Sequence, residues 1–327
     1  MPLIDSAFRP AWWLPGAHLQ TLWPALARRP TELVTHRERL ELDDGDFLDL
    51  VWSGPPRAPV VLFLHGLEGG LRSHYATSTM RRLAAAGLRT CLLLFRNCGD
   101  EPNRLPISYH SGKTDDPQRV VEHIVATTGG PPLGAVGVSL GGNVLLKWLG
   151  ELGDRSPLQR AMAISVPFRL DDCARRLERG FSRVYQHHLV SRLQRSYLRK
   201  FGQGSGPLDM DVRDLRTFRQ FDDRVTAALH GFAGVDDYYA RCSSRPFIAS
   251  IRVPTLILQA RNDPFMTADT PPSPAELPDK VWLEMPADGG HVGFIGGRNP
   301  LRAQYYLEQR IVDWFTRPLP ADVSEMP

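Results

Sequence analysis

The chain has 327 residues, of which 42% are hydrophobic and 23% are charged, and this composition excludes a disordered or collagen-like protein. Its 39 lysines and arginines face 36 aspartates and glutamates, so the formal net charge is only +3 and does not indicate a whole-chain nucleic-acid binder. Four cysteines without a CxxC pair exclude a disulfide framework and a zinc ribbon.

Residues 1–35 are rich in proline and tryptophan and have neither a basic start nor a long apolar run. They do not resemble a secretory signal, and their aromatic residues are atypical of a free tail. We therefore predict an arm that packs on the rest of the chain. The longest apolar run, at residues 60–64, is much shorter than the roughly 20 residues that span a bilayer, so the default expectation is a cytoplasmic protein.

The middle of the chain alternates between strand and helix patterns. Two strand-like runs flank Asp43-Asp44-Gly45-Asp46, which predicts a hairpin. The predicted strands are 37–42, 47–52, 60–64, 88–95, 133–138, 160–166, 255–260 and 281–285, and the predicted helices include 73–86, 115–128, 140–152 and 300–317. Continuous apolar strands that alternate with helices predict an α/β fold with a mostly parallel, doubly wound sheet.

Residues 167–250 interrupt this alternation, because no strand pattern occurs in them. They favour helices over 171–200 and 211–229 and a short aromatic piece around Tyr238-Tyr239. We predict a helical cap inserted between two strands of one core, which consists of residues 36–166 and 251–327.

The strongest single motif is a serine in a glycine-rich turn. Gly137-Val138-Ser139-Leu140-Gly141 matches G-x-S-x-G between a predicted strand and a predicted helix. A sharp strand-to-helix turn leaves no room for side chains beside the serine and exposes its hydroxyl near a helix N-terminus, which favours negative charge. We predict that Ser139 is a nucleophile.

A serine nucleophile needs a base, and the base needs a carboxylate that orients it. Asp263 and His291 each follow one of the last two predicted strands, and open α/β sheets build their sites at the carboxyl ends of strands. The chain order Ser, Asp, His fits this topology. We predict that Asp263 and His291 complete a catalytic triad, with Asp269 and Asp288 as the competing carboxylates.

The loop after the strand 60–64 reads His65-Gly66-Leu67-Glu68-Gly69. In hydrolases of this topology, the loop at this position donates a backbone N–H to the oxyanion hole. We assign the two donors to Leu67 and Leu140. The His65 side chain either braces this loop, which we prefer, or contacts substrate; Tyr109 and His110 are candidates for the pocket wall, with a structural role as the alternative.

These motifs resemble one branch of the α/β-hydrolase superfamily, the YheT-like (embryogenesis-associated) hydrolases, over nearly the whole chain. The matching segments are Phe8-Arg9-Pro10, Gly16-Ala17-His18-Leu19-Gln20-Thr21, His65-Gly66-Leu67-Glu68-Gly69, Glu101-Pro102-Asn103-Arg104, Tyr109-His110-Ser111-Gly112, Gly137-Val138-Ser139-Leu140-Gly141-Gly142-Asn143, Gly231-Phe232, Val235-Asp236-Asp237-Tyr238-Tyr239 and Gly290-His291-Val292-Gly293-Phe294. The resemblance implies an α/β-hydrolase fold and a triad at Ser139, Asp263 and His291. It also implies esterase or lipase activity, with acyl-lipid substrates in some eukaryotic relatives.

The chain departs from this family in two places. Some eukaryotic relatives carry an N-terminal membrane anchor, which the sequence does not show. Arg96-Asn97-Cys98-Gly99-Asp100 stands where many members read Arg-Gly-Cys followed by small residues, which bears on the shape of this loop and not on the triad.

The predicted function is a serine hydrolase that cleaves carboxylic esters through an acyl-enzyme, with no cofactor or metal and with a small-molecule ester or acyl lipid as substrate. A thioesterase, amidase or acyltransferase that uses the same triad is an alternative. A non-catalytic binding protein on a hydrolase fold is an alternative of another class. Oligomeric state, acyl chain length and leaving group stay open.

Other reactive residues carry weaker signals. Cys98 lies near the expected site but has no base of its own, and it is interpreted as a loop residue. His187 and His188 are adjacent on a predicted helix and therefore do not share a face for metal binding. Asp236-Asp237 is assigned to arginine pairing or helix capping.

The cap carries a segregated charge. Residues 174–200 contain seven arginines and one lysine against Glu178 alone, and they have apolar residues at helical spacing, among them Leu177, Phe181, Val184 and Leu189. One interpretation is attraction for anionic amphiphiles, including peripheral contact with a membrane surface. The interpretation we prefer is a solvated helix face paired with carboxylates of the core.

Overall fold

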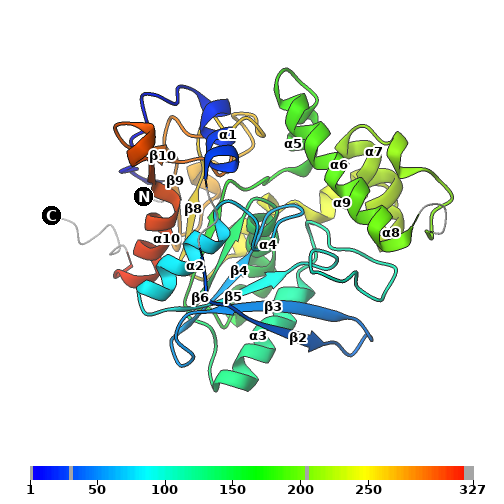
Figure 1. The fold of residues 1–327 in the computed structure, drawn as a ribbon, viewed down its shortest axis with the longest axis horizontal. Coiled ribbons are helices and arrows are strands. Elements are labelled where there is room, and N and C mark those ends of the chain that lie inside the picture. Colours follow the sequence, from blue (N-terminus) through cyan, green and yellow to red (C-terminus); the bar gives the residue numbers. More distant parts are fainter. Residues whose placement is uncertain (1–2, 29–31, 203–205, 320–327) are drawn as a thin grey trace.

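The computed structural model describes residues 3–28, 32–202 and 206–319 (Figure 1). Its strands are β1 (Leu3–Ile4), β2 (His36–Glu41), β3 (Phe47–Ser53), β4 (Val60–Leu64), β5 (Arg89–Leu94), β6 (Gly134–Val138), β7 (Arg160–Ile164), β8 (Thr255–Leu258), β9 (Val281–Glu284), β10 (Ile295–Gly296) and β11 (Gln304–Tyr305). The first nine form one sheet in the order β1-β9-β8-β7-β6-β4-β5-β3-β2. In this order, each pair of neighbouring strands from β1 through β9, β8, β7, β6 and β4 to β5 is parallel. The pairs β5–β3 and β3–β2 are antiparallel.

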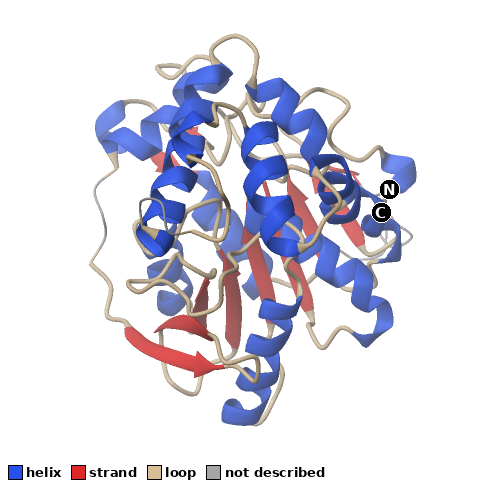
Figure 2. Cartoon of the chain, turned by 90° about the vertical axis from the view of Figure 1, so that its right-hand side faces the viewer, coloured by secondary structure: helices blue, strands red, loops and turns tan. Residues whose placement is uncertain are grey.

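Helices cover both faces of this sheet (Figure 2). They are α1 (Ala17–Ala27), α2 (Ala76–Ala85), α3 (Asp115–Thr128), α4 (Leu140–Leu152), α5 (Leu170–Leu177), α6 (Ser182–Phe201), α7 (Phe218–Phe221), α8 (Ala228–His230), α9 (Val235–Cys242) and α10 (Tyr306–Thr316), with shorter helical turns between them. The predicted doubly wound α/β fold and the β2–β3 hairpin are therefore confirmed.

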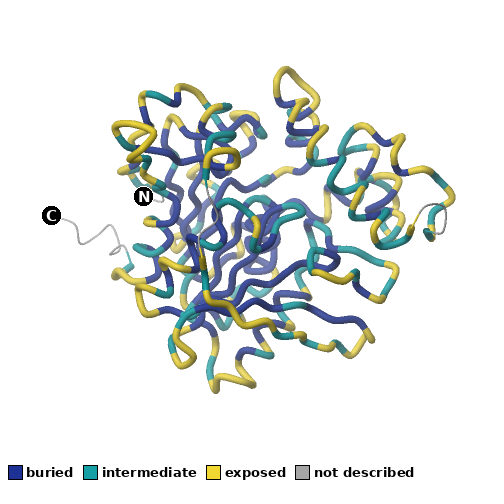
Figure 3. Tube along the Cα trace, viewed as in Figure 1, coloured by how far each residue is buried: buried dark blue, intermediate teal, exposed yellow. Residues whose placement is uncertain are grey.

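The central strand β4 explains why its sequence is apolar throughout. Val61 and Phe63 pack into one hydrophobic cluster with residues of α2 and α10. Leu62 and Leu64 point to the opposite face and pack with residues of α3 and α4. A parallel strand with both faces covered has no side for polar residues, and Figure 3 shows the buried chain concentrated along the strands.

Helices α5 to α9 lie between β7 and β8 in the sequence and outside the sheet (Figure 1). We call residues 167–250 the cap, of which 203–205 fall outside the described residues. The predicted single helix over 171–200 is wrong, because the chain leaves α5 after Leu177 and Gly180 adopts a left-handed φ of 55° before α6 begins.

The predicted helix over 211–229 is also interrupted. Thr217 and Gln220 form a capping box that starts α7 anew, and a π-helical segment, η3 (Asp222–Ala227), follows directly. The predicted helix over 300–317 begins only at Tyr306, because Gln304–Tyr305 pair with β10.

The arm contains two elements that its composition did not predict. Helix α1 lies in it, and β1 extends the sheet beyond β9, with Leu3 opposite Leu283. Ala11 and Leu14 of the arm are buried and pack with Ile295 of β10. Among the described residues, no helix combines the length and apolar character that a membrane span needs.

Candidate active site

Ser139 occupies a strained turn between β6 and α4, with φ 53° and ψ −117°. The flanking glycines are required by close packing. A Cβ on Gly137 would lie 2.4 Å from the Gly141 carbonyl oxygen, and one on Gly141 would lie 2.4 Å from the Leu64 carbonyl oxygen. The backbone thus holds Ser139 at the N-terminus of α4 in a conformation that a serine adopts only when its surroundings enforce it.

The structure brings Ser139, His291 and Asp263 into one hydrogen-bonded row. The Ser139 Oγ lies 2.9 Å from His291 Nε2, and His291 Nδ1 lies 3.0 Å from Asp263 Oδ2. Because the carboxylate accepts the Nδ1 proton, Nε2 is left to accept from the serine hydroxyl. The three residues come from the carboxyl ends of β6, β9 and β8, as their positions after predicted strands indicated.

The Asp263 side chain is 1% exposed, and its carboxylate accepts two more hydrogen bonds, from the Phe265 backbone N–H at 2.8 Å and from Gln259 Nε2 at 3.1 Å. These donors fix its orientation toward His291. The competing Asp288 instead accepts a hydrogen bond from Asn262 at 3.0 Å.

The loop that carries His291 is held by residues far away in the sequence. The His291 backbone N–H donates to Thr21 Oγ1 at 2.9 Å, and the next N–H, of Val292, donates to Ser165 Oγ at 3.0 Å. Val292 has a positive φ of 55°, which costs energy in a β-branched residue. Thr21 belongs to the arm and was not predicted as a functional residue, although it ends the Gly16–Thr21 motif.

Aromatic rings fix the imidazole from the side. The Phe265 ring stacks on it with centroids 3.9 Å apart and planes 3° from parallel. Tyr185 of α6 packs on Phe265 at 5.0 Å, and its hydroxyl lies 3.1 Å from His18 Nδ1 in the arm. The cap and the arm therefore meet beside His291.

The two predicted oxyanion donors, Leu67 and Leu140, both line the pocket above Ser139. Around Leu67, the Gly66 N–H donates to Tyr75 Oη at 2.8 Å and the Glu68 N–H donates to Tyr109 Oη at 2.7 Å. The Leu67 N–H has no such partner among the described residues. This arrangement leaves an N–H of the loop available to a ligand beside the serine.

The remaining predicted pocket residues differ from one another. His65 is fully buried, with Nδ1 2.7 Å from the Gly66 carbonyl oxygen and Nε2 accepting the Phe95 N–H at 3.1 Å, and it does not line the pocket. This placement favours the bracing role of His65 over a contact with substrate, because backbone groups lie within hydrogen-bond distance of both ring nitrogens. Tyr109 and His110 do line the pocket.

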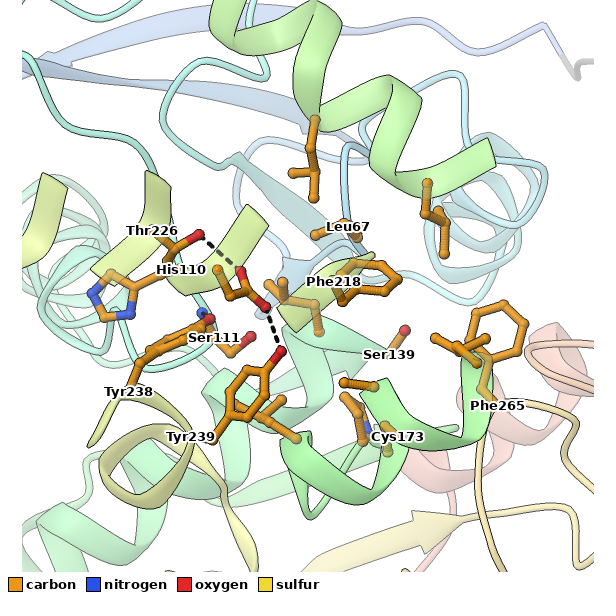
Figure 4. A pocket seen from close by; sticks show the side chains of 18 of the residues that line it. Leu67, His110, Ser111, Ser139, Cys173, Phe218, Thr226, Tyr238, Tyr239 and Phe265 are labelled. Carbon is orange, nitrogen blue, oxygen red and sulfur yellow. Dashed lines mark hydrogen bonds between the residues drawn. The ribbon is translucent and has the colours of Figure 1, made fainter. Parts of the chain in front are cut away.

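The pocket itself lies between the sheet and the cap (Figure 4). Its volume of about 110 Å³ far exceeds the roughly 10–15 Å³ that one water molecule requires. The apolar residues that line it are Leu67, Leu140, Pro167, Leu170, Cys173, Ala174, Leu177, Leu189, Leu193, Phe218 and Phe265. Six of them come from α5 and α6, so the cap supplies much of the apolar wall.

Loop 96–100, whose sequence differs from that of many family members, is fixed by buried charges. The Arg96 guanidinium is almost completely buried and pairs with Asp46 and Asp116 at 2.8 Å each. Burial raises the pKa of the neighbouring Cys98 thiol well above its usual value, so Cys98 stays a protonated loop residue. No cluster of three or more histidine, cysteine or acidic residues suited to a metal occurs in the part of the chain described.

Three basic residues of α6 donate to loops of the core. Arg192 donates to the Glu68 carbonyl oxygen, Arg199 to the carbonyl oxygens of Asn97 and Gly99, and Lys200 to the Ile107 carbonyl oxygen at 2.7 Å. Their hydrogen-bond acceptors are thus backbone groups. Burial raises the pKa of the Glu68 carboxyl, and the charges of Arg192 and Arg199 act in the opposite direction on it.

The apolar side of the same region is incompletely covered. Phe181, just before α6, is 48% exposed and Val184 is 54% exposed, whereas Tyr185 is buried. The predicted apolar stripe therefore divides between packing against Phe265 and contact with solvent.

Comparison with known proteins agrees with this geometry. A family model described as the alpha/beta hydrolase fold matches residues 59–297. A protein of Escherichia coli K12 named as a candidate esterase, YheT, is 41% identical over 97% of this chain and 95% of its own length. The chain is a YheT-like α/β-hydrolase.

More distant relatives extend the comparison. The phospholipase ABHD3 of Mus musculus is 29% identical to the YheT-like chain over 93% of it and 77% of the relative. The solved structure of the Pyrococcus furiosus esterase Pf2001 superposes with a TM-score of 0.56 at 14% identity, covering 90% of this chain and 98% of that one. At this low identity the superposition shows a shared fold, and family membership makes the chain a hydrolase.

Proposed function

We propose that the protein hydrolyses carboxylic esters through an acyl-enzyme on Ser139. One observation carries the proposal: Ser139, His291 and Asp263 are joined by hydrogen bonds of 2.9 and 3.0 Å at the floor of a largely apolar pocket. An oriented imidazole beside a serine hydroxyl is the arrangement that makes serine a nucleophile at neutral pH.

In the first half of the reaction, His291 Nε2 removes the Ser139 proton as Oγ attacks the ester carbonyl carbon. The N–H groups of Leu67 and Leu140 donate to the oxyanion, while Asp263 stabilises the imidazolium. The carbon–oxygen bond to the alcohol then breaks, and His291 gives its proton to the leaving alcohol.

In the second half, His291 removes a proton from a water molecule that attacks the acyl-enzyme. The tetrahedral intermediate collapses, Ser139 recovers its proton from His291, and the carboxylic acid leaves. Phe265 covers one face of the imidazole, which limits its rotation during both proton transfers.

The pocket supports an ester with an apolar chain. Its wall is built mainly of leucine, phenylalanine and other apolar side chains from the cap, and the names of the relatives include an esterase and a phospholipase. We infer a small-molecule ester or acyl-lipid substrate whose chain lies under α5 and α6. Apolar burial provides about 0.8 kcal/mol per methylene group, so affinity rises with chain length until the cavity is filled.

A fluorophosphonate probe and a series of 4-nitrophenyl esters of increasing chain length test this proposal. The wild-type protein is expected to bind the probe covalently and to hydrolyse the esters, and Ser139→Ala is expected to do neither. Ser156→Ala, a serine outside the pocket, is the matched control and should react like the wild type. Equal labelling of Ser139→Ala and wild type would refute the assignment of the nucleophile.

A further inference from the structure

The pocket wall is not apolar all the way round. On the side away from Phe265, Figure 4 shows a group of polar side chains from the cap and from the loop before α3. The polar residues that line this side are His110, Ser111, Asp222, Thr226, Tyr238 and Tyr239. The proposed cycle uses none of them.

Asp222 is the charged member of this group. Its carboxylate accepts hydrogen bonds from Thr226 Oγ1 and from Tyr239 Oη, both at 2.8 Å, one on each oxygen. The two dashed lines in Figure 4, which start at Thr226 and at Tyr239, mark these bonds. A carboxylate has about four acceptor sites, so Asp222, which lines the pocket, has the capacity to accept further hydrogen bonds.

The Asp222 carboxylate has no counter-charge. Within the described residues, neither an ion pair nor a cationic neighbour is found for it, and burial raises its pKa to about 6. The group is therefore ionised above neutral pH, in a site where a charge without a partner costs free energy. A ligand that carries a hydrogen-bond donor at this position would therefore complement the charge of Asp222.

The local backbone is distorted where this carboxylate enters the pocket. Asp222 is the first residue of the π-helical segment η3, and such segments are rare and frequent at functional sites. The adjacent Asp223 is directed elsewhere, because it accepts the Val235 N–H at 3.0 Å at the start of α9. Of two adjacent aspartates, one caps a helix and the other lines the cavity.

We propose that Asp222 is a specificity-determining residue that accepts a hydrogen bond from a hydroxyl group of the substrate. The inference rests on the proposed function, and it narrows the substrate class to esters that carry a hydroxyl on the portion lying against the polar side of the pocket. A purely aliphatic chain would give the carboxylate no donor beyond Thr226 and Tyr239, and an anionic group would be repelled by it.

A hydroxyl fits this site better than an ammonium group does. It can donate to Asp222 and also accept from a neighbouring donor such as Ser111 or Tyr238. An ammonium group needs several acceptors, and Asp222 is the only carboxylate among the lining residues.

The experiment compares kcat/KM for matched esters in the wild type, Asp222→Asn, Asp222→Leu and the control Asp223→Asn. The acyl series is the 4-nitrophenyl esters of hexanoic, 6-hydroxyhexanoic and 6-aminohexanoic acid, and the alcohol series is ethyl octanoate against 1-octanoylglycerol. A charge-assisted hydrogen bond corresponds to a preference of about tenfold to a hundredfold. In the wild type, we expect this preference for the hydroxylated ester in either the acyl or the alcohol series. The preference should be reduced in Asp222→Asn, absent in Asp222→Leu and unchanged in Asp223→Asn.

An equal hydroxyl preference in the wild type and both Asp222 variants, or none in the wild type, would overturn the proposal. A stronger preference for the amino ester would overturn the hydroxyl assignment. Binding of octane-1,8-diol and 1-octanol to Ser139→Ala, by calorimetry, separates this inference from the proposed function. Tighter diol binding that depends on Asp222 supports the subsite even if no ester is turned over, and equal binding of the two alcohols contradicts it.

Discussion

Replacing Thr21 by valine tests the hydrogen bond between the arm and the loop that carries His291. Valine has the shape of threonine but no hydroxyl, so the change removes the acceptor of the His291 N–H, now bound at 2.9 Å. It also removes the bond from Thr21 Oγ1 to the Ala17 carbonyl oxygen at 2.8 Å, which lies within α1 and contributes little.

The magnitude follows from the group left behind. A buried N–H that loses its acceptor costs about 1–3 kcal/mol, and we expect the free energy of unfolding to fall by this amount. The loop also loses the hydrogen bond at the backbone of His291 itself. A displacement of about 1 Å at a catalytic group can reduce the rate roughly a hundredfold. We therefore expect kcat/KM to fall between about tenfold and a hundredfold.

Urea denaturation and ester hydrolysis measure the two effects. Thr21→Ser keeps the hydroxyl and is the matched control, with stability and activity near those of the wild type. If Thr21→Val equals Thr21→Ser in both assays, the arm does not hold the histidine loop and the reasoning fails.

Three further predictions concern the site. Asp263→Asn removes the acceptor that orients the His291 Nδ1 proton, so kcat should fall by roughly 10³–10⁴-fold with little change in fold by circular dichroism. Gly141→Ala places a Cβ 2.4 Å from the Leu64 carbonyl oxygen, so thermal unfolding should occur at a lower temperature and activity should be lost. The pKa of Asp222 rises from 3.8 to about 6 on burial, so its contribution to stability is greatest below pH 4 and is lost as the pH rises through 6. Denaturation at pH 4 and at pH 7 measures this effect. Between the two pH values, the free energy of unfolding of Asp222→Asn should rise relative to that of the wild type by up to about 3 kcal/mol.

The first two of these predictions have control variants in the same chain, and the third has a contradicting outcome. Asp288→Asn changes the competing carboxylate and should keep kcat; loss of activity there and not in Asp263→Asn would reverse the assignment. Gly130→Ala adds a methyl group to open space and should leave the unfolding temperature unchanged. A constant stability difference between Asp222→Asn and wild type across the pH range would contradict the raised pKa.

The sequence identifies those parts of the site that depend on local order. Ser139, Asp263 and His291 each follow an apolar strand, and parallel strands bring their carboxyl ends to one edge of the sheet. The hydrophobic period locates the strands and the glycines mark the turn, so the three residues could be predicted without knowledge of any contact between them.

The residues that the sequence did not reveal depend on distant packing. The sequence does not distinguish Asp222 from the adjacent Asp223. In the structure, Asp222 begins the π-helical segment and lines the pocket, whereas Asp223 does not line it. Arg192 and Lys200 bind backbone carbonyl oxygens, and such acceptors are present at every residue, so no sequence pattern marks them. The bracing role of His65 could be inferred because it lies within the loop that it supports.

The bond between Thr21 and the His291 backbone joins positions 270 residues apart. During synthesis, Thr21 is therefore made long before its partner. At about 5–20 residues per second, the ribosome adds the second partner roughly 14–54 seconds after the first. An isolated helix of the 11 residues of α1 is only marginally stable in water. For most of its translation, the nascent chain thus carries the α1 segment without its partner and largely unfolded, and the loop around His291 gains this hydrogen bond only after nearly the whole chain has been made.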